Sequence, residues 1–179
     1  SLESIVIPEG VTAIGTWLEY EKTYYSSSFS GCKSLKEIII PDSVTAIGDS
    51  AFYGCTSLSK LKLSNNLRII QERTFSGCTS LKEIVIPDSV TEIRGMCYSS
   101  GYDGDYDGGA FSGCTSLAEI TIPDSVTEIG SSAFSGCTSL SKVDLPKKLT
   151  TIEAYTFSGC SSLESIVIPE GVTAIGTWL

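Results

Sequence analysis

A 23-residue repeat runs through this chain and constrains its fold more than any other feature. A Gly-Cys pair marks each repeat, and successive cysteines of these pairs are 23, 23, 36, 23 and 23 residues apart. Repeats of this length cannot bury a core singly, so each is expected to form one coil of a stacked solenoid. The marking cysteines are Cys32, Cys55, Cys78, Cys114, Cys137 and Cys160.

One repeat predicts two short strands and a turn. Apolar residues alternate over residues 35–40, which favours a strand that ends at Pro41, because proline cannot donate to a strand ladder. Residues 44–48 read as a second extended piece, and residues 50–55 as a single helical or 3₁₀ turn closed by glycine. Stacking should place equivalent side chains on one another in a continuous core. The predicted core residues are Leu35, Ile38, Ile40, Val44, Ile47, Phe52 and Cys55.

The run I-x-I-P-x-x-V-T-x-I-G-x-x-A-F-x-G-C-x-x-L resembles the BspA-like leucine-rich repeats over essentially all 179 residues. The resemblance implies a right-handed, β-rich solenoid with a parallel sheet of L-x-x-I-x-I strands, a second strand at V-T-x-I-G and a turn at A-F-x-G-C. We therefore expect residues 1–179 to form a single solenoid of seven coils, the last one incomplete. The resemblance also implies secreted or cell-surface proteins that act in adhesion and in host or matrix binding.

The repeats are grouped in threes, and residues 162–179 are identical to residues 1–18. This pattern indicates a window from a longer array, in which any signal peptide or anchor would lie elsewhere. Neither end resembles the atypical capping repeats that close natural solenoids. The hypothesis is that the chain associates end to end or is unstable alone.

Two insertions, at about residues 16–28 and 95–109, interrupt the same position of two repeats and should leave the same side of the solenoid. They contain most of the tyrosines of the chain. Tyrosine among Ser, Gly and Asp is typical of binding loops, and aromatic rings also stack on sugars. The alternative is that both loops fold over the edge as packing or spacer. The candidate ligand-binding residues are Trp17, Tyr20, Tyr24, Tyr25, Tyr98, Tyr102 and Tyr106, with Tyr53 in the turn region between the insertions.

The second insertion also contains the start of a calcium loop, D-x-D-x-D-G, with Asp103, Asp105 and Asp107 as candidate oxygen ligands. The twelfth position, where such loops carry a bidentate glutamate, is Cys114. An acidic loop without metal is therefore favoured over a calcium site, and no other cofactor is expected. Cys97, in the same insertion, is expected to be exposed and oxidisable, whereas the cysteines of the repeat should be buried, reduced thiols.

Composition excludes several functions. The net charge of −9 opposes binding to nucleic acid or to anionic lipid. No apolar run approaches the roughly 20 residues of a membrane-spanning helix, so no membrane insertion is expected. The chain contains no histidine, and neither a nucleophile motif nor a phosphate-binding glycine loop is present, so an enzyme is not expected.

The leading hypothesis is a non-enzymatic adhesion module at the cell surface or outside the cell, which presents its aromatic loops to a protein or glycan. The alternative is an architectural spacer or a self-associating surface array without a specific ligand. Deletion of each insertion, followed by binding and melting measurements, separates the two.

Overall fold

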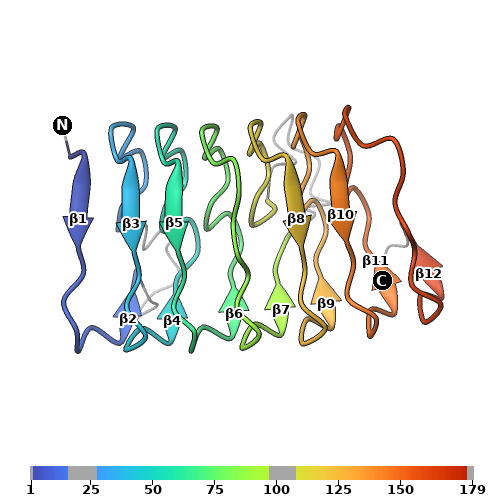
Figure 1. Ribbon diagram of the computed structural model, residues 1–179, viewed down its shortest axis with the longest axis horizontal. Coiled ribbons are helices and arrows are strands. Elements are labelled where there is room, and N and C mark those ends of the chain that lie inside the picture. Colours follow the sequence, from blue (N-terminus) through green and yellow to red (C-terminus); the bar gives the residue numbers. More distant parts are fainter. Residues whose placement is uncertain (1, 16–27, 97–107, 177–179) are drawn as a thin grey trace.

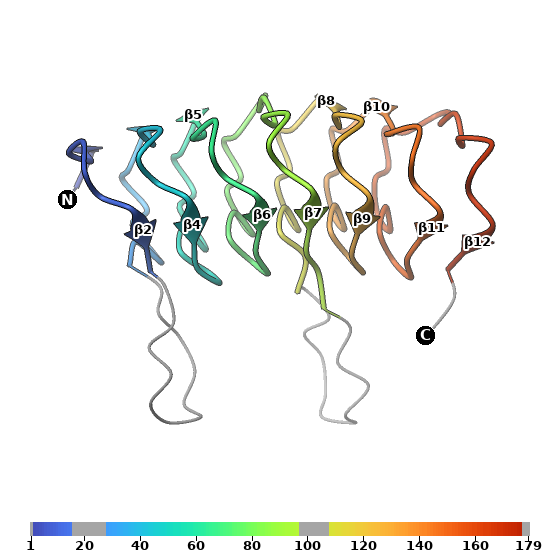
Figure 2. The same ribbon diagram turned by 90° about the horizontal axis from the view of Figure 1, so that it is seen from below.

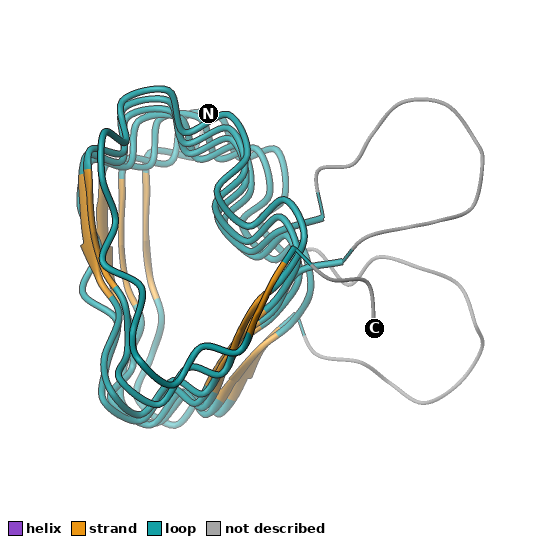
Figure 3. Ribbon diagram, turned by 90° about the vertical axis from the view of Figure 1, so that its right-hand side faces the viewer, coloured by secondary structure: helices purple, strands orange, loops and turns teal. Residues whose placement is uncertain are grey.

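Each repeat forms one coil, and the coils stack in chain order into a row (Figure 1). The structure, a computed structural model, describes residues 2–15, 28–96 and 108–176. Seen end-on, the coils share one outline around a central core, and two rows of strands lie on different sides of it (Figure 3). Counted from each Ser-Leu pair, coils one to seven are residues 1–33, 34–56, 57–79, 80–115, 116–138, 139–161 and 162–179.

The first ladder consists of the strands predicted at L-x-x-I-x-I. They pair in parallel, in the order β1-β3-β5 and, farther along the row, β8-β10. Coil four contributes no strand here, although Lys82 O still accepts a hydrogen bond from Ala118 N at 3.2 Å. The strands are β1 (Ser4–Val6), β3 (Glu37–Ile39), β5 (Lys60–Lys62), β8 (Glu119–Thr121) and β10 (Lys142–Asp144).

The second ladder consists of two-residue strands at V-T-x-I-G. They are also parallel and form the groups β2-β4, β6-β7-β9 and β11-β12. Both interruptions fall between the second and third coils of a triplet. The strands are β2 (Ala13–Ile14), β4 (Ala46–Ile47), β6 (Ile69–Ile70), β7 (Glu92–Ile93), β9 (Glu128–Ile129), β11 (Thr151–Ile152) and β12 (Ala174–Ile175).

Side chains bridge the coils where the second ladder is interrupted. The Asp42 carboxylate accepts hydrogen bonds from the backbone N and the side-chain amide of Asn65, at 2.8 and 3.2 Å. One triplet later, Asp124 accepts from the backbone N of Lys147 at 2.9 Å. These hydrogen bonds lower the pKa of both aspartates. The interruption of the second ladder and the hydrogen bonds beside it thus recur with the period of the triplet seen in the sequence.

The A-F-x-G-C segment is a set of hydrogen-bonded turns, and no helix forms in the described residues. Tyr53 N donates to Ser50 O and Cys55 N donates to Phe52 O, which is the spacing of a 3₁₀ helix. Positive φ angles at Ser50 (56°) and Gly54 (66°) stop these bonds from propagating. The glycine of every Gly-Cys pair has φ between 66° and 72°, the region that only glycine adopts without strain.

The predicted core is confirmed, because all seven predicted residues of coil two are buried. Neighbouring phenylalanines stack at centroid separations of 5.3–5.7 Å, from Phe29 in coil one to Phe157 in coil six. Such continuous packing aligns each coil on the one before it. No helix in the described part of the chain is long and apolar enough to cross a bilayer.

Candidate binding edge

Both insertions are attached at the end of a second-ladder strand. The first begins after β2 and the second after β7, and the chain returns each time at the phenylalanine turn of the same coil, at Phe29 and at Phe111. Because β2 and β7 belong to one row of strands and both phenylalanines to one stack, the attachment points lie on one edge of the solenoid (Figure 2).

A backbone hydrogen bond closes the neck of the second insertion. Ala110 N donates to Arg94 O at 3.0 Å, so the outgoing and returning chains are held together. Gly108 lies against Met96, and a Cβ on Gly108 would stand 2.6 Å from Met96 O. The insertion therefore leaves the coil through a narrow neck made of described residues.

The neck also rests directly on coil five. A Cβ on Gly95 would collide with the carbonyl oxygen of Ser131, and one on Gly109 with that of Ser132. Only glycine allows the two backbones to approach this closely. Coil five thus fixes where the neck leaves the solenoid.

Arg94 replaces the glycine that follows the second strand in coils two and five. Its Nε donates to Glu92 Oε2 at 3.0 Å, and its Nη1 donates to Gln71 Oε1 at 2.9 Å. The guanidinium therefore links coils three and four.

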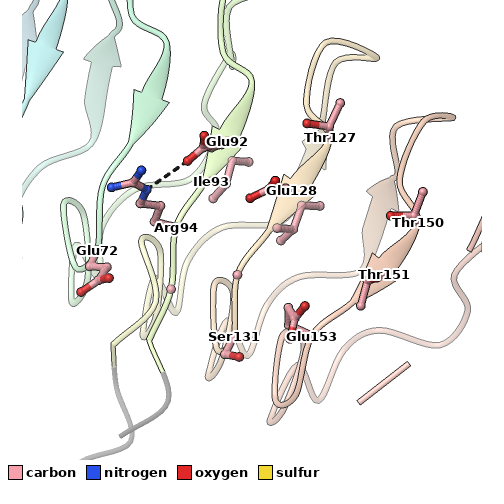
Figure 4. A pocket seen from close by; sticks show the side chains of 13 residues that line it. Glu72, Glu92, Ile93, Arg94, Thr127, Glu128, Ser131, Thr150, Thr151 and Glu153 are labelled. Atoms are coloured by element: carbon pink, nitrogen blue, oxygen red, sulfur yellow. Dashed lines mark hydrogen bonds and ion pairs between the residues drawn. The ribbon is translucent and has the colours of Figure 1, made fainter. Parts of the chain in front are cut away.

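Beside Arg94 the second ladder carries a groove with a volume of about 710 Å³ (Figure 4). It extends from coil three to coil six across the outer face of the strands. Four of its five ionisable groups are glutamates, and the fifth is Arg94. Its polar lining comprises Glu72, Glu92, Arg94, Thr127, Glu128, Ser131, Thr150, Thr151 and Glu153. Sequence analysis missed this groove, and the only signal for it was the glutamate in V-T-E-I of coils four and five.

Acidic side chains also gather on coils two and three. Burial raises the pKa of Asp49, and Arg94 acts in the opposite direction. Burial also raises the pKa of Glu72, and the neighbouring Asp49 carboxylate adds to the effect. Tyr53, whose side chain sequence analysis expected near the insertions, is 45% exposed on coil two.

The repeat cysteines are unsuited to nucleophilic chemistry. From coil two to coil six, each Sγ donates to the carbonyl oxygen of the phenylalanine in the preceding coil, at 3.1–3.3 Å. Burial raises the pKa of the Cys55 thiol to about 11 and that of Cys137 to about 12. The expected row of reduced, buried thiols is present, with Cys32 at its start half-buried. Cys97 lies outside the described residues.

The other predicted site residues also lie outside the described residues. Their assignment to ligand or calcium binding stays a prediction. Within residues 2–15, 28–96 and 108–176 there is no group of three or more potential metal ligands. The residues concerned are Trp17, Tyr20, Tyr24, Tyr25, Tyr98, Tyr102 and Tyr106, with Asp103, Asp105 and Asp107.

Comparison with known families agrees with the coil geometry. The family model described as the BspA type leucine rich repeat region matches residues 1–102 and 107–179, in six copies. The chain belongs to this family. BspA-type repeats are leucine-rich repeats, whose families are generally binding or surface modules. No curated protein matches the chain.

Solved structures of bacterial leucine-rich repeat proteins share this fold. A leucine rich repeat protein of T. pallidum is 34% identical, with a TM-score of 0.79 over 97% of this chain and 73% of its own. A leucine-rich repeat protein of Bacteroides ovatus is 28% identical, with a TM-score of 0.67 over 97% of this chain and 50% of its own. A leucine rich cell surface protein of Faecalibacterium prausnitzii is 37% identical, with a TM-score of 0.64 over 79% of this chain and 31% of its own. The chain thus spans half or less of the last two.

Proposed function

We propose that this chain is a non-enzymatic binding module, outside the cell or on its surface, that presents its two insertions to a protein or glycan ligand. The observation that carries the proposal is the shared edge. Both insertions are attached after strands of the second ladder, and the neck of the second is closed and seated on coil five. A rigid scaffold that holds variable loops is the usual arrangement of binding proteins.

Composition supports the same function. The insertions hold six of the eight tyrosines, and a rigid aromatic ring supplies contact area at low entropic cost. The F. prausnitzii protein, 37% identical to this chain, is described as a cell surface protein, which supports an extracellular location. Two insertions on one edge would bind a repeated ligand with gain in avidity.

Loop replacement tests the proposal, because the repeat supplies its own short connections. Residues 16–28 are replaced by Asp-Ser-Ala, as found between Gly48 and Phe52 of coil two. Residues 95–110 are replaced by Ser-Ser-Ala, as found between Gly130 and Phe134 of coil five. Binding to a printed glycan panel and to fixed epithelial cells is then compared with the parent chain.

We expect each replacement to weaken the same binding signal at least ten-fold while the melting temperature stays close to that of the parent. Tyr24→Ala and Tyr102→Ala should each reproduce part of the loss, and Tyr155→Ala, in coil six away from the insertions, should not. Unchanged binding with an altered melting temperature would instead support the architectural alternative.

A further inference from the structure

The second ladder carries a pair of like charges in register. Glu92 on β7 lies directly opposite Glu128 on β9. Like charges at opposed positions of a ladder repel one another and weaken the pairing. Arg94 relieves this in part, but its hydrogen bonds run to Glu92 and, away from Glu128, to Gln71 in coil three.

Two carboxylates farther along the row enlarge the acidic surface. Glu153 follows β11 in coil six, at the position that Arg94 occupies in coil four and Gly130 in coil five. Gly130 itself lines the groove between these two positions, and its Cα packs against the backbone of Gly95. Glu72 lines its other end, on coil three. The groove thus has carboxylates along its whole length and one guanidinium that is already bound.

The first ladder shows that this charge pattern is not a general property of the repeat. There Glu37 is opposite Lys60 and forms an ion pair at 3.9 Å, and Glu119 is opposite Lys142. In both opposed pairs of that ladder whose two members are charged, the charges are opposite, and Lys142 forms its ion pair with Asp144 at 3.4 Å. On the second ladder the fold leaves a surplus of negative charge facing solvent.

We propose that this groove is a docking surface for an extended, lysine- or arginine-bearing segment of a partner protein. Charge complementarity selects this occupant, because a cationic side chain above Gly130 would lie among the carboxylates of Glu92, Glu128 and Glu153. The groove crosses four coils, about 14 Å at the spacing of neighbouring strands, which is the length of about four extended residues. Alternate residues of such a segment face the groove, and the hydroxyls of Thr127, Thr150 and Ser131 accept or donate hydrogen bonds along it.

The groove adjoins the start of the second insertion at Gly95, and its other lining residues belong to strands and turns of coils three to six. The proposal does not rest on the candidate ligand-binding residues of the insertions, and it holds whether or not the loops bind a ligand. Anionic partners such as nucleic acid or acidic lipid are disfavoured by the same carboxylates.

The test uses the full chain and a fluorescein-labelled peptide of four Lys-Ser pairs, with a Glu-Ser peptide as its counterpart. Binding is followed by fluorescence anisotropy at 20 and 300 mM NaCl. The groove variant is Glu128→Gln with Glu153→Gln. The matched control is Glu83→Gln with Glu119→Gln, which changes the net charge equally but alters the outer face of the first ladder.

We expect the Lys-Ser peptide to bind the parent chain and the control variant with Kd values within two-fold of one another. The groove variant should bind it at least ten-fold more weakly, and 300 mM NaCl should weaken binding to the parent. The Glu-Ser peptide should not bind.

Three outcomes would overturn the proposal. The first is no binding of the Lys-Ser peptide to the parent chain at low salt. The second is an equal loss in the groove and control variants, which would show attraction to net charge alone. The third is displacement of the peptide by spermine at equal molar concentration, which would point to a free polyamine instead of a protein segment. A melting curve of each variant shows that all three chains are folded.

Discussion

The two ladders are built from the same repeat, yet their outer faces differ in charge. On the first ladder the two opposed pairs of charged residues, Glu37 with Lys60 and Glu119 with Lys142, carry opposite charges, and Lys36 forms an ion pair with Glu3 at 3.0 Å. On the second ladder Glu92 is opposed to Glu128 beside an acidic groove, and both insertions are attached at its strand ends. The inner faces are alike, since both contribute isoleucine side chains to one core.

This difference shows that different positions of the repeat provide stability and accept sequence changes. Inward positions are constrained in every coil, because an altered side chain would meet its neighbours on both sides. Outward positions are constrained on the first ladder by pairing between coils. The second ladder tolerates repulsion, a guanidinium in place of a glycine, and long insertions, which is the pattern expected if this edge binds a ligand as proposed.

The largest effect on stability is expected from a substitution in the core, which both ladders share. Ile38→Asp places an unpaired charge at a position that is 1% exposed, and should lower the free energy of unfolding by at least about 4 kcal/mol. The adjacent Ile39→Asp, at 54% exposure and opposite Lys62, should change it by less than about 1 kcal/mol. Urea unfolding followed by circular dichroism measures both. Equal effects at the two positions would show that the strand faces are assigned wrongly.

A second test addresses the backbone contact that is special to the edge of the second ladder. Gly95→Ala should cost about 1–3 kcal/mol, because the new methyl group meets the backbone of coil five. Gly171→Ala serves as the control, since its Cβ would stand 3.4 Å from the nearest atom and should change stability by less than about 0.5 kcal/mol. Thermal melting compares the two variants. A Gly95 variant as stable as its control would contradict the close backbone contact between the neck and coil five.

The thiol row between the ladders predicts a loss of stability at alkaline pH. The folded chain holds these thiols protonated, because burial raises the pKa from 9.0 to about 11 for Cys55 and about 12 for Cys137. Their contribution is therefore complete below pH about 9 and is lost as the pH rises through the folded values. Cys137→Ala should reduce the slope of stability against pH above 9. Reaction of the native thiols with Ellman's reagent at pH 8 as fast as in urea would refute the burial.

A smaller increase in stability is expected when the like-charged pair Glu92 and Glu128 of the second ladder is converted into an oppositely charged pair, as on the first ladder. Glu128→Lys places opposite charges at the opposed positions of β7 and β9, and should raise the free energy of unfolding by about 0.2–1 kcal/mol. Glu119→Lys, which would put two lysines opposite each other on the first ladder, should lower it by a similar amount. Chemical unfolding at low salt gives both values, and the same sign for the two variants would break the comparison.

The smallest effect concerns the corners where the second ladder is interrupted. The pKa of Asp42 and that of Asp124 are lowered by backbone hydrogen bonds, so their contribution is present above the unfolded value and is lost as the pH falls through the folded value. Asp42→Asn with Asp124→Asn should flatten the dependence of melting temperature on pH below about 4. Asp88→Asn, at the same turn of coil four, is the control. A steeper acid dependence in the double variant would argue against this role.

The sequence by itself determined the core and the coil. A given repeat position faces inward in every coil and packs on the equivalent side chains of the neighbouring coils. The repeat period alone therefore identified Leu35, Ile38, Val44 and Phe52 as buried. The sequence also placed both insertions at the same position of the repeat. The alternation along the first strand also accounts for the exposed apolar residues Val6, Ile39, Val85 and Val167, which face away from the core.

Only the tertiary structure decided which coils pair and which outward groups meet. Residues 1–18 and 162–179 are identical, yet Ile14 is 5% exposed and Ile175 is 62% exposed, and only the first copy forms a first-ladder strand. Coils two and four likewise differ only at Ile39 and Val85 over residues 35–44 and 81–90, and only coil two forms that strand. The groove unites Glu72, Arg94 and Glu153 from three coils. The physical reason is that strand pairing, exposure and surface charge depend on the contacts between neighbouring coils. The repeat pattern describes only the residues within one coil.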